Sequence, residues 1–371
     1  MDQEENNEAT VSVPRRVPAL IVYLRPFRMI QSDAIDNWSA TIQEVNSRRW
    51  DYVKLHEIVG GIDVGLEAPY HMLVGRDGAL ALPPIPKLRD DREVVEFFNR
   101  CLAALIIGGV YCEAVSLDHL EIGSVIDWKY LRTHGHGQAA SNRFHLLIRQ
   151  RQASPLEAIE LLAPRTETFH SLQAAMNVGL AALADVPPLS GEFLLKGVSG
   201  IARRDWGAAL TNLWIVIEQI TMFLWEREVL KTVAGDSRRI DGRLEQLKDA
   251  RTWTTASRQE MLHQKGVVET DTLRNLFVAR KCRNELMHRG VHASEAAAQA
   301  AYSAVLSLLQ IALARISPLS AINLSDHSLS DPFKPVDKGP LEPKYWMAIP
   351  KLPGEEALER EEARVHRPGR T

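Results

Sequence analysis

The sequence predicts an α+β domain followed by an all-α antiparallel helical bundle, in a chain that is mostly helical overall. Over residues 17–150, short β-branched runs alternate with one amphipathic segment. From residue 191 to about residue 316 there is almost no proline, and apolar residues recur at intervals of three and four, which is typical of helices that bury one face. The 371 residues exceed what one hydrophobic core usually organises, so two domains with tails are expected.

Three local patterns predict the α+β domain. Residues 19–24 form a β-branched run of strand length. Residues 71–74 and 79–82 flank a glycine-bounded segment, residues 75–78, and this arrangement predicts a hairpin with a simple turn. Residues 91–107 follow, and their apolar side chains keep the spacing of a helix with one wide buried face.

The remainder of the chain carries helix signals. Ser154 and Glu157 form a capping pattern around a proline, which predicts a helix start, and a second helix is expected over residues 166–184. Two longer stripes recur at intervals of four and three: Trp206, Leu210, Leu213, Ile217, Ile220 and Leu224, then Ala298, Tyr302, Val305, Leu309, Ala312 and Ile316. Such stripes must be buried against other helices, which predicts an antiparallel bundle.

These patterns divide the chain into five segments. Residues 1–16 are polar and acidic and are expected to form a disordered tail. Residues 17–150 are the α+β domain, a candidate sensor, and residues 151–190 are a helical connector. The helical bundle occupies residues 191–318, and the proline-rich residues 319–371 are expected to be extended or disordered.

Composition narrows the classes of function. The net charge of −3 excludes a general nucleic-acid coat, so a site for a polyanion must be a local patch. Three cysteines, Cys101, Cys112 and Cys282, cannot form a disulfide framework or a zinc ribbon. The amino terminus is acidic where a secretory signal would be basic and then apolar, and the uncharged stretch 101–112 is too short to cross a membrane. We therefore expect a soluble cytoplasmic protein without a membrane segment.

One helix of the predicted bundle is unusually cationic. It is expected to start near Asp271 and to stop at Gly290. Between Arg274 and Gly290, one acidic residue stands against five basic ones: Arg274, Arg280, Lys281, Arg283 and Arg289. Residues 195–316 as a whole carry 18 basic and 13 acidic residues, so positive charge is concentrated in this part of a chain that is acidic overall.

The same helix end carries a histidine with polar neighbours at helical spacing. Asn284 and His288 are one turn apart and share a face, and Arg280 extends that line. Arg283 points elsewhere on an ideal helix, but its long side chain can reach the same face.

An arginine followed five positions later by a histidine is a weak signal alone. The chain contains three such pairs: Arg165 with His170, Arg258 with His263, and Arg283 with His288. Only the third has an asparagine after the arginine, a strongly basic surrounding and a glycine at the helix end. Context therefore singles out the third pair as the candidate site.

The segment 283–288, at the end of one bundle helix and followed by a last amphipathic helix, resembles the HEPN superfamily. The upstream helix over residues 205–225, with Glu218 in its apolar run, is similar to that family's pattern. The resemblance covers roughly residues 191–316, about a third of the chain. It implies a metal-independent endoribonuclease that needs no cofactor and works as a homodimer, as in bacterial toxin–antitoxin, abortive-infection and antiviral defence systems. Its partners would be RNA, a second copy of the chain, and a regulatory ligand or antitoxin.

The chemistry of the residues supports such a role. Histidine titrates near neutrality and serves as general acid or base, and arginine offers a permanently charged planar fork to phosphate oxygens. We therefore predict that Arg283, His288 and Asn284 are catalytic and that Glu218 supports Arg283. Arg280, Lys281 and Arg289 are the predicted RNA contacts. The motif offers a single histidine, whereas the cleavage calls for two proton transfers, so we expect a twofold dimer to supply the second histidine.

Other interpretations of this site remain open. Arg283 and His288 can be structural, with the arginine paired to Glu218 and the histidine bonded to a helix-end carbonyl. Some HEPN proteins are inactive, so a non-catalytic dimerisation module that binds a nucleotide or a protein is the alternative function. A third alternative places an unrecognised activity in residues 17–150.

A metal site is not expected. His134, His136 and His145 lack further ligands at suitable spacing. The three tryptophans Trp206, Trp214 and Trp225 fall within bundle stripes and are expected in the core or at a dimer contact.

Overall fold

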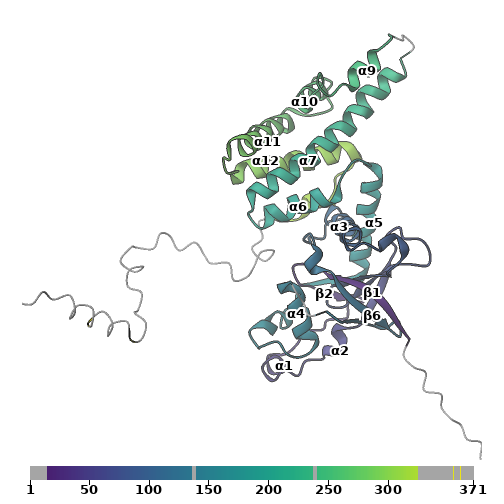
Figure 1. Cartoon of the computed structure of the whole chain (residues 1–371), viewed down its shortest axis with the longest axis vertical. Coiled ribbons are helices and arrows are strands. Elements are labelled where there is room, and N and C mark those ends of the chain that lie inside the picture. Colours follow the sequence, from purple (N-terminus) through teal and green to yellow (C-terminus); the bar gives the residue numbers. More distant parts are fainter. Residues whose placement is uncertain (1–14, 136–138, 237–239, 325–353, 355–359, 361–371) are drawn as a thin grey trace, which may run out of the picture. The chain divides into compact units, whose positions relative to one another are not determined.

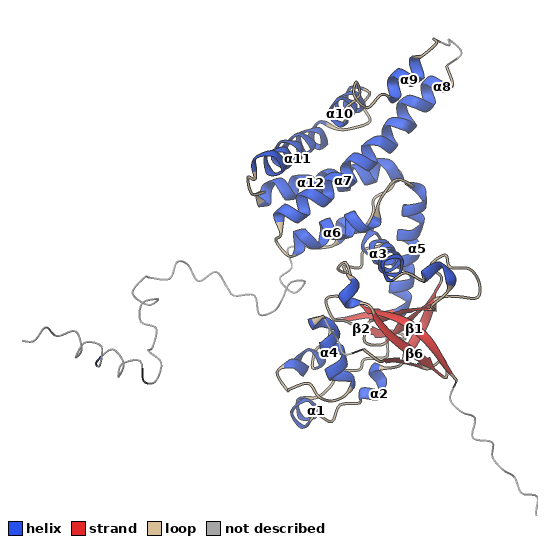
Figure 2. Ribbon diagram, in the orientation of Figure 1, coloured by secondary structure: helices blue, strands red, loops and turns tan. Residues whose placement is uncertain are grey.

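The protein is a mixed α+β structure in which helices predominate, as the sequence predicts (Figure 1, Figure 2). The computed structural model describes residues 15–135, 139–236 and 240–324, together with Gly354 and Arg360. The described residues up to Leu324 belong to one unit. Most of the two predicted tails lies outside the described residues. Within them, Arg16 already belongs to the first strand, and a short helical turn over Pro318–Ala321 follows the bundle.

Six strands form one antiparallel sheet in the order β3-β4-β5-β1-β6-β7. They are β1 (Arg16–Tyr23), β3 (Ile58–Ile62), β4 (Met72–Gly75), β5 (Ala79–Leu82), β6 (Glu121–Ile126) and β7 (Tyr130–Thr133). The sheet curls so that its outermost strands, β3 and β7, meet. At their contact, the Ile58 amide donates to the Lys129 carbonyl over 2.8 Å, and the Leu131 amide donates to the His56 carbonyl over 2.7 Å. A separate parallel pair joins β2 (Met29–Gln31) to β8 (Thr166–Thr168).

The predicted hairpin and the predicted long helix of this part are confirmed. Strands β4 and β5 pair antiparallel, and Gly78 adopts a φ of 79° in the turn between them, which a residue with a side chain rarely adopts. Helix α3 spans Asp91–Ile107, with the Asp90 carboxylate accepting from the Arg92 amide over 2.7 Å.

Several short helices complete the α+β part. They are α1 (Ile42–Ser47), α2 (Tyr52–Leu55), α4 (Ala140–Arg149) and the 3₁₀ turn η3 (Glu157–Leu161), which share a small core around the buried Trp50. The helix expected after Ser154 is only this short turn, although the reciprocal Ser154–Glu157 capping bonds are present at 2.8 and 3.3 Å. Two further 3₁₀ turns are η1 (Pro86–Leu88) and η2 (Leu117–His119).

Helix α5 (Phe169–Asp185) begins later than predicted. Residues 166–168 are instead strand β8, because their backbone pairs with β2, and Thr168 caps the helix. Helix α5 crosses α3 at two glycines. A Cβ on Gly179 would lie 1.9 Å from the Ala104 carbonyl oxygen, and one on Gly108 would lie 2.1 Å from that of Ala175. The two backbones are therefore in direct contact.

The helical part follows with α6 (Gly191–Ala202), α7 (Trp206–Trp225), η4 (Glu226–Leu230), α8 (Lys231–Ala234), α9 (Arg243–Lys248), α10 (Thr255–Gln264), α11 (Thr270–Arg289), α12 (Glu295–Leu313) and η5 (Pro318–Ala321). The predicted stripes are buried along α7 and α12, with two corrections. Trp206 is only half-buried, and Ile316 is 69% exposed because it follows the end of α12. Trp214 and Trp225 lie in the core, as predicted.

Among the described residues, two helices are long and apolar enough to span a bilayer by length and composition, one running over Trp206–Ala234 and the other over Glu295–Leu313. Half of each apolar window is buried inside the protein, and α7 packs along α12. Both properties are compatible with core helices of a soluble protein.

One hydrophobic core runs from the sheet into the helical part. It joins Val22 and Leu80 of the sheet to α3, α5 and α6, and continues through Ile217 and Val305. The predicted segments 17–150 and 191–318 therefore share a core, and their independence as domains stays a prediction.

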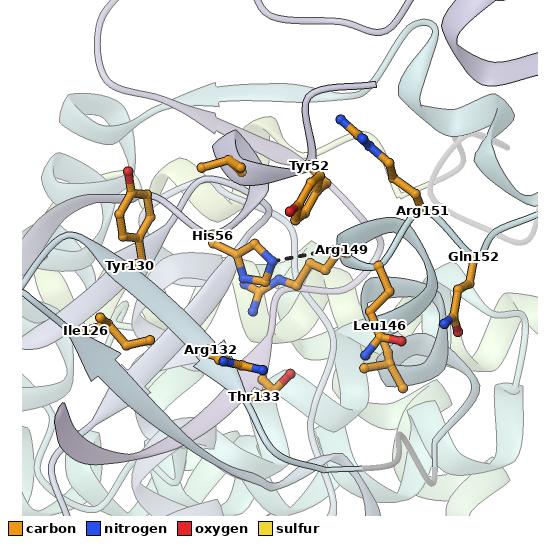
Figure 3. Close-up of a pocket in the computed structure, with 12 residues that line it drawn as sticks. Tyr52, His56, Ile126, Tyr130, Arg132, Thr133, Leu146, Arg149, Arg151 and Gln152 are labelled. Carbon is orange, nitrogen blue, oxygen red and sulfur yellow. Dashed lines mark hydrogen bonds between the residues drawn. The ribbon is translucent and has the colours of Figure 1, made fainter. Parts of the chain in front are cut away.

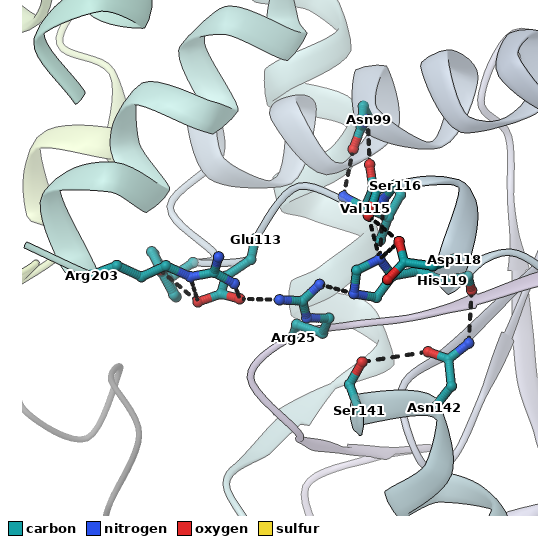
Figure 4. A network of polar contacts seen from close by, with 11 residues as sticks. Arg25, Asn99, Glu113, Val115, Ser116, Asp118, His119, Ser141, Asn142 and Arg203 are labelled. Carbon is teal, nitrogen blue, oxygen red and sulfur yellow. Dashed lines mark hydrogen bonds and ion pairs between the residues drawn. The ribbon is translucent and has the colours of Figure 1, made fainter. Parts of the chain in front are cut away.

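A polar network spans the same junction (Figure 4). The Glu113 carboxylate accepts from Arg25, which follows β1, over 2.9 Å and from Nε of Arg203, which follows α6, over 2.9 Å. Arg25 also contacts His119, and the Asn142 amide donates to the His119 carbonyl over 2.9 Å. Charged side chains thus bind the sheet to the first helix of the bundle.

Candidate functional site

The cationic segment singled out in the sequence forms the end of α11. The helix stops where predicted, because Gly290 adopts a φ of 66° and its amide donates to the carbonyls of Glu285 and Leu286. This left-handed cap leaves the last turn, with His288 and Arg289, at the surface.

The predicted site residues are accessible to solvent. Asn284 and His288 are exposed, one turn apart on α11, and Arg283 is half-buried. The Arg283 guanidinium donates to the Asn284 side-chain oxygen over 3.2 Å, so the arginine does turn toward the asparagine. The predicted RNA contacts Lys281 and Arg289 are also exposed, whereas Arg280 is half-buried.

Two large apolar side chains share this helix surface. Phe277 is 57% exposed and Met287 is 55% exposed, and the Arg280 guanidinium lies 5.4 Å from the centre of the Phe277 ring. A groove of about 570 Å³ between α10 and α11 includes Leu273, Phe277 and Arg280 in its lining. Its lining ends at Arg280, about two helical turns before His288. In a single chain, His288 therefore lies on an open surface outside the groove.

Glu218 has a different partner from the one expected. Its carboxylate accepts from the Trp214 indole over 2.8 Å, one turn earlier on α7. Between the described residues Glu218 and Arg283 there is neither an ion pair nor a hydrogen bond. A half-buried carboxylate needs a donor, and here a neighbour on its own helix provides it.

A second Arg–His pair of the same spacing lies in a different environment. Arg258 is buried, donates to the Met222 sulfur over 3.0 Å and lies over the Trp225 ring. The His263 ring bonds the Val268 carbonyl over 2.7 Å. These contacts are structural, and they differ from the exposed setting of Asn284 and His288.

A buried charged cluster that sequence analysis does not predict lies in the α+β part. Asp77, in the predicted turn, is fully buried and binds the Arg149 guanidinium through both oxygens, over 2.7 and 2.8 Å. The same carboxylate bonds His145 over 2.9 Å, and the Tyr23 ring stacks on His145 with centroids 3.7 Å apart. The residues 75–78 form more than a simple turn, because they place a buried anion under α4.

These contacts also bear on the histidines considered for a metal. His145 bonds Asp77, whereas His134 bonds the Ser124 hydroxyl over 3.1 Å, and His136 lies outside the described residues. Within the described ranges, no group of three or more His, Cys, Asp or Glu side chains is arranged to hold a metal ion.

The buried cluster predicts how stability depends on pH. Burial lowers the pKa of His145, and the nearby Arg149 charge acts in the same direction against the opposing effect of Asp77. In the unfolded chain His145 binds a proton near its usual pKa of about 6.5. The pKa of His145 is lower in the folded protein. As the pH falls through the pKa of the unfolded chain, the unfolded state therefore binds more protons than the folded state, and the free energy of unfolding decreases. We expect the free energy of unfolding in urea to decrease between pH 7.5 and pH 5.5.

The variant His145→Asn serves as the control for this prediction. Its amide can donate to Asp77 but does not titrate. The decrease should be smaller in this variant, and an equal slope in both proteins would contradict the assignment to His145.

Fold and site together define a mixed α+β, mostly helical protein with an exposed cationic helix end. No protein-family model matches the chain, and neither a curated protein nor a solved structure is significantly similar to it.

Proposed function

We propose that this chain is a metal-independent endoribonuclease of the bacterial defence or toxin type. Its helical part would be a HEPN-like bundle that acts on RNA in the cytoplasm. The observation that carries the proposal is the solvent-accessible group of Arg283, Asn284 and His288 at the cationic end of α11. Enclosure of these side chains in the core would have excluded contact with a polymer.

The proposed reaction is attack of a ribose 2′-hydroxyl on the adjacent phosphorus. A base removes the hydroxyl proton, the bond from phosphorus to the 5′-oxygen breaks, and an acid protonates that oxygen, which leaves a 2′,3′-cyclic phosphate and a 5′-hydroxyl. His288 suits either proton transfer. Arg283 suits the negative charge that develops on the phosphate oxygens, and its bond to Asn284 supports an orienting role for the amide.

A homodimer would complete this site. Each chain contributes one His288, on an open surface, whereas the reaction needs an acid and a base together. The exposed Phe277 and Met287 on α11 are side chains that a second copy would cover. A twofold axis near the end of α11 would bring two copies of His288 and Arg283 to one phosphate.

The test is cleavage of labelled RNA by the purified full chain in the presence of EDTA. The variants His288→Ala and Arg283→Ala are each expected to lose at least about 100-fold in rate. His292→Ala is the matched control, since His292 is exposed but follows the end of α11, and it should cleave like the wild type. Undiminished cleavage by either site variant would remove that residue from the mechanism.

The alternative function is a non-catalytic HEPN-like module that dimerises and binds a nucleotide or a protein, such as an antitoxin. The bond of Glu218 to Trp214 favours it, because Arg283 then lacks the expected support. The exposed Phe277 and Met287 would also suit a protein partner. A wild-type chain that is dimeric by light scattering but leaves RNA intact would support this alternative.

A further inference from the structure

A groove of about 680 Å³ opens in the α+β part, on different elements from α11 (Figure 3). Three segments build it: α2 with the residue after it, the hairpin of β6 and β7, and the end of α4 with the loop that follows. Its lining includes Tyr52, Tyr130, Arg132, Arg149 and residues 150–152. Its size is within the range of ordinary small-molecule sites.

The lining is cationic. It contains three arginines and, among the described residues, no carboxylate. Arg149 is already neutralised by its two bonds to Asp77. Arg132 is exposed, and in the described part of the chain neither Arg132 nor Arg151 forms an ion pair. In the described part of the chain, neither guanidinium charge is therefore neutralised by a carboxylate, and both can attract an anion.

The local backbone holds Arg151 in place. This residue has a φ of 55°, in the left-handed region that side chains disfavour, and its Nε donates to the Trp50 carbonyl over 2.7 Å. The Trp50 indole in turn donates to the Ile148 carbonyl over 2.8 Å. Strained backbone that is held by buried neighbours is typical of binding sites.

Aromatic and amide side chains lie beside these cations. The Tyr52 ring lies 4.6 Å from the Arg151 guanidinium and is 37% exposed, and Tyr130 lines the other side of the groove in Figure 3. Gln150 and Gln152 are exposed and can both donate and accept hydrogen bonds. Stacking surfaces next to permanent cations are the combination that binds a nucleobase and its phosphate.

We propose that this groove binds a nucleotide, with its phosphate on Arg132 and its base against the tyrosines, where Arg151 lies beside the Tyr52 ring. The nucleotide can be a free mononucleotide or the end of an RNA strand, and both present the same chemistry. This site is additional to the one proposed on α11 and does not depend on it.

Calorimetric titration of the full-length His288→Ala chain tests the proposal, since this background excludes RNA cleavage by the α11 site. The probes are adenosine and guanosine 5′-monophosphates, a short RNA oligonucleotide, inorganic phosphate and adenosine. Mononucleotide binding identifies a free nucleotide as the ligand, and binding of the oligonucleotide alone identifies a strand end. In either case Arg132→Gln and Arg151→Gln should weaken binding by about tenfold or more. Because Arg132 is exposed, its variant should fold normally even if Arg151→Gln is destabilised.

Arg143→Gln is the matched control, since Arg143 is exposed on α4 but does not line the groove. It should bind like the parent chain. The proposal is overturned by the absence of nucleotide and oligonucleotide binding, or by equal affinities in Arg132→Gln and Arg143→Gln. Inorganic phosphate that binds as tightly as the nucleotides would also overturn it, because the base would then contribute nothing.

Discussion

Replacement of Asp77 by alanine is expected to lower the free energy of unfolding by about 3–5 kcal/mol, because it leaves the Arg149 guanidinium buried without its counter-charge. The loss should exceed that of an ordinary surface variant, since Asp77 is fully buried and also bonds His145. Denaturation in urea, followed by circular dichroism, measures the change.

The double variant Asp77→Ala, Arg149→Met is the control for this prediction. It removes both charges, so no guanidinium remains buried without a partner, and its loss should be smaller than the sum of the two single losses. Additive losses would show that Asp77 and Arg149 do not stabilise the fold through each other.

Replacement of Gly179 by alanine should destabilise the protein by about 3 kcal/mol. The added Cβ would lie 1.9 Å from the Ala104 carbonyl oxygen, and backbone on both sides of the contact cannot move aside as a flexible side chain can. Helices α3 and α5 would have to separate, which would loosen the core that joins the sheet to the bundle. The midpoint of thermal unfolding reports the change.

Gly207→Ala on α7 is the matched control. The nearest atom to its added Cβ is the Asp205 carboxylate oxygen, 3.9 Å away, so there is room for the methyl group. Alanine is the better helix former, and stability should stay the same or rise by up to about 1 kcal/mol. A stable Gly179→Ala protein would mean that α3 and α5 tolerate a wider separation.

Local sequence patterns were sufficient for the main elements. Helix α3, the β4–β5 hairpin and the Gly290 stop of α11 each depend on a few neighbouring residues. Elements that depend on distant partners were missed. Residues 166–168 form a strand only because β2 lies beside them, and the turn after Ser154 stays short although its capping bonds form.

In the candidate sites, too, features set by neighbouring residues could be predicted, and features set by distant residues could not. The exposed group of Asn284 and His288 could be predicted, because helical spacing places them on one face. The donor to Glu218 could not, since either a neighbour on α7 or a residue on α11 would satisfy the carboxylate. Asp77 carried no local sign of burial, because Arg149 is 72 residues away in the chain. The groove likewise combines segments from Tyr52 to Gln152 that only the folded sheet brings together.

The meeting of β3 and β7 has a consequence for behaviour at high concentration. An open sheet offers a row of unpaired amides and carbonyls to any extended peptide, and this is a common route to aggregation. Here some of these amides and carbonyls pair between the two outer strands, through the His56–Leu131 and Ile58–Lys129 hydrogen bonds. A foreign strand must first break this seam, so β-type association of the intact protein should be slow unless the sheet opens.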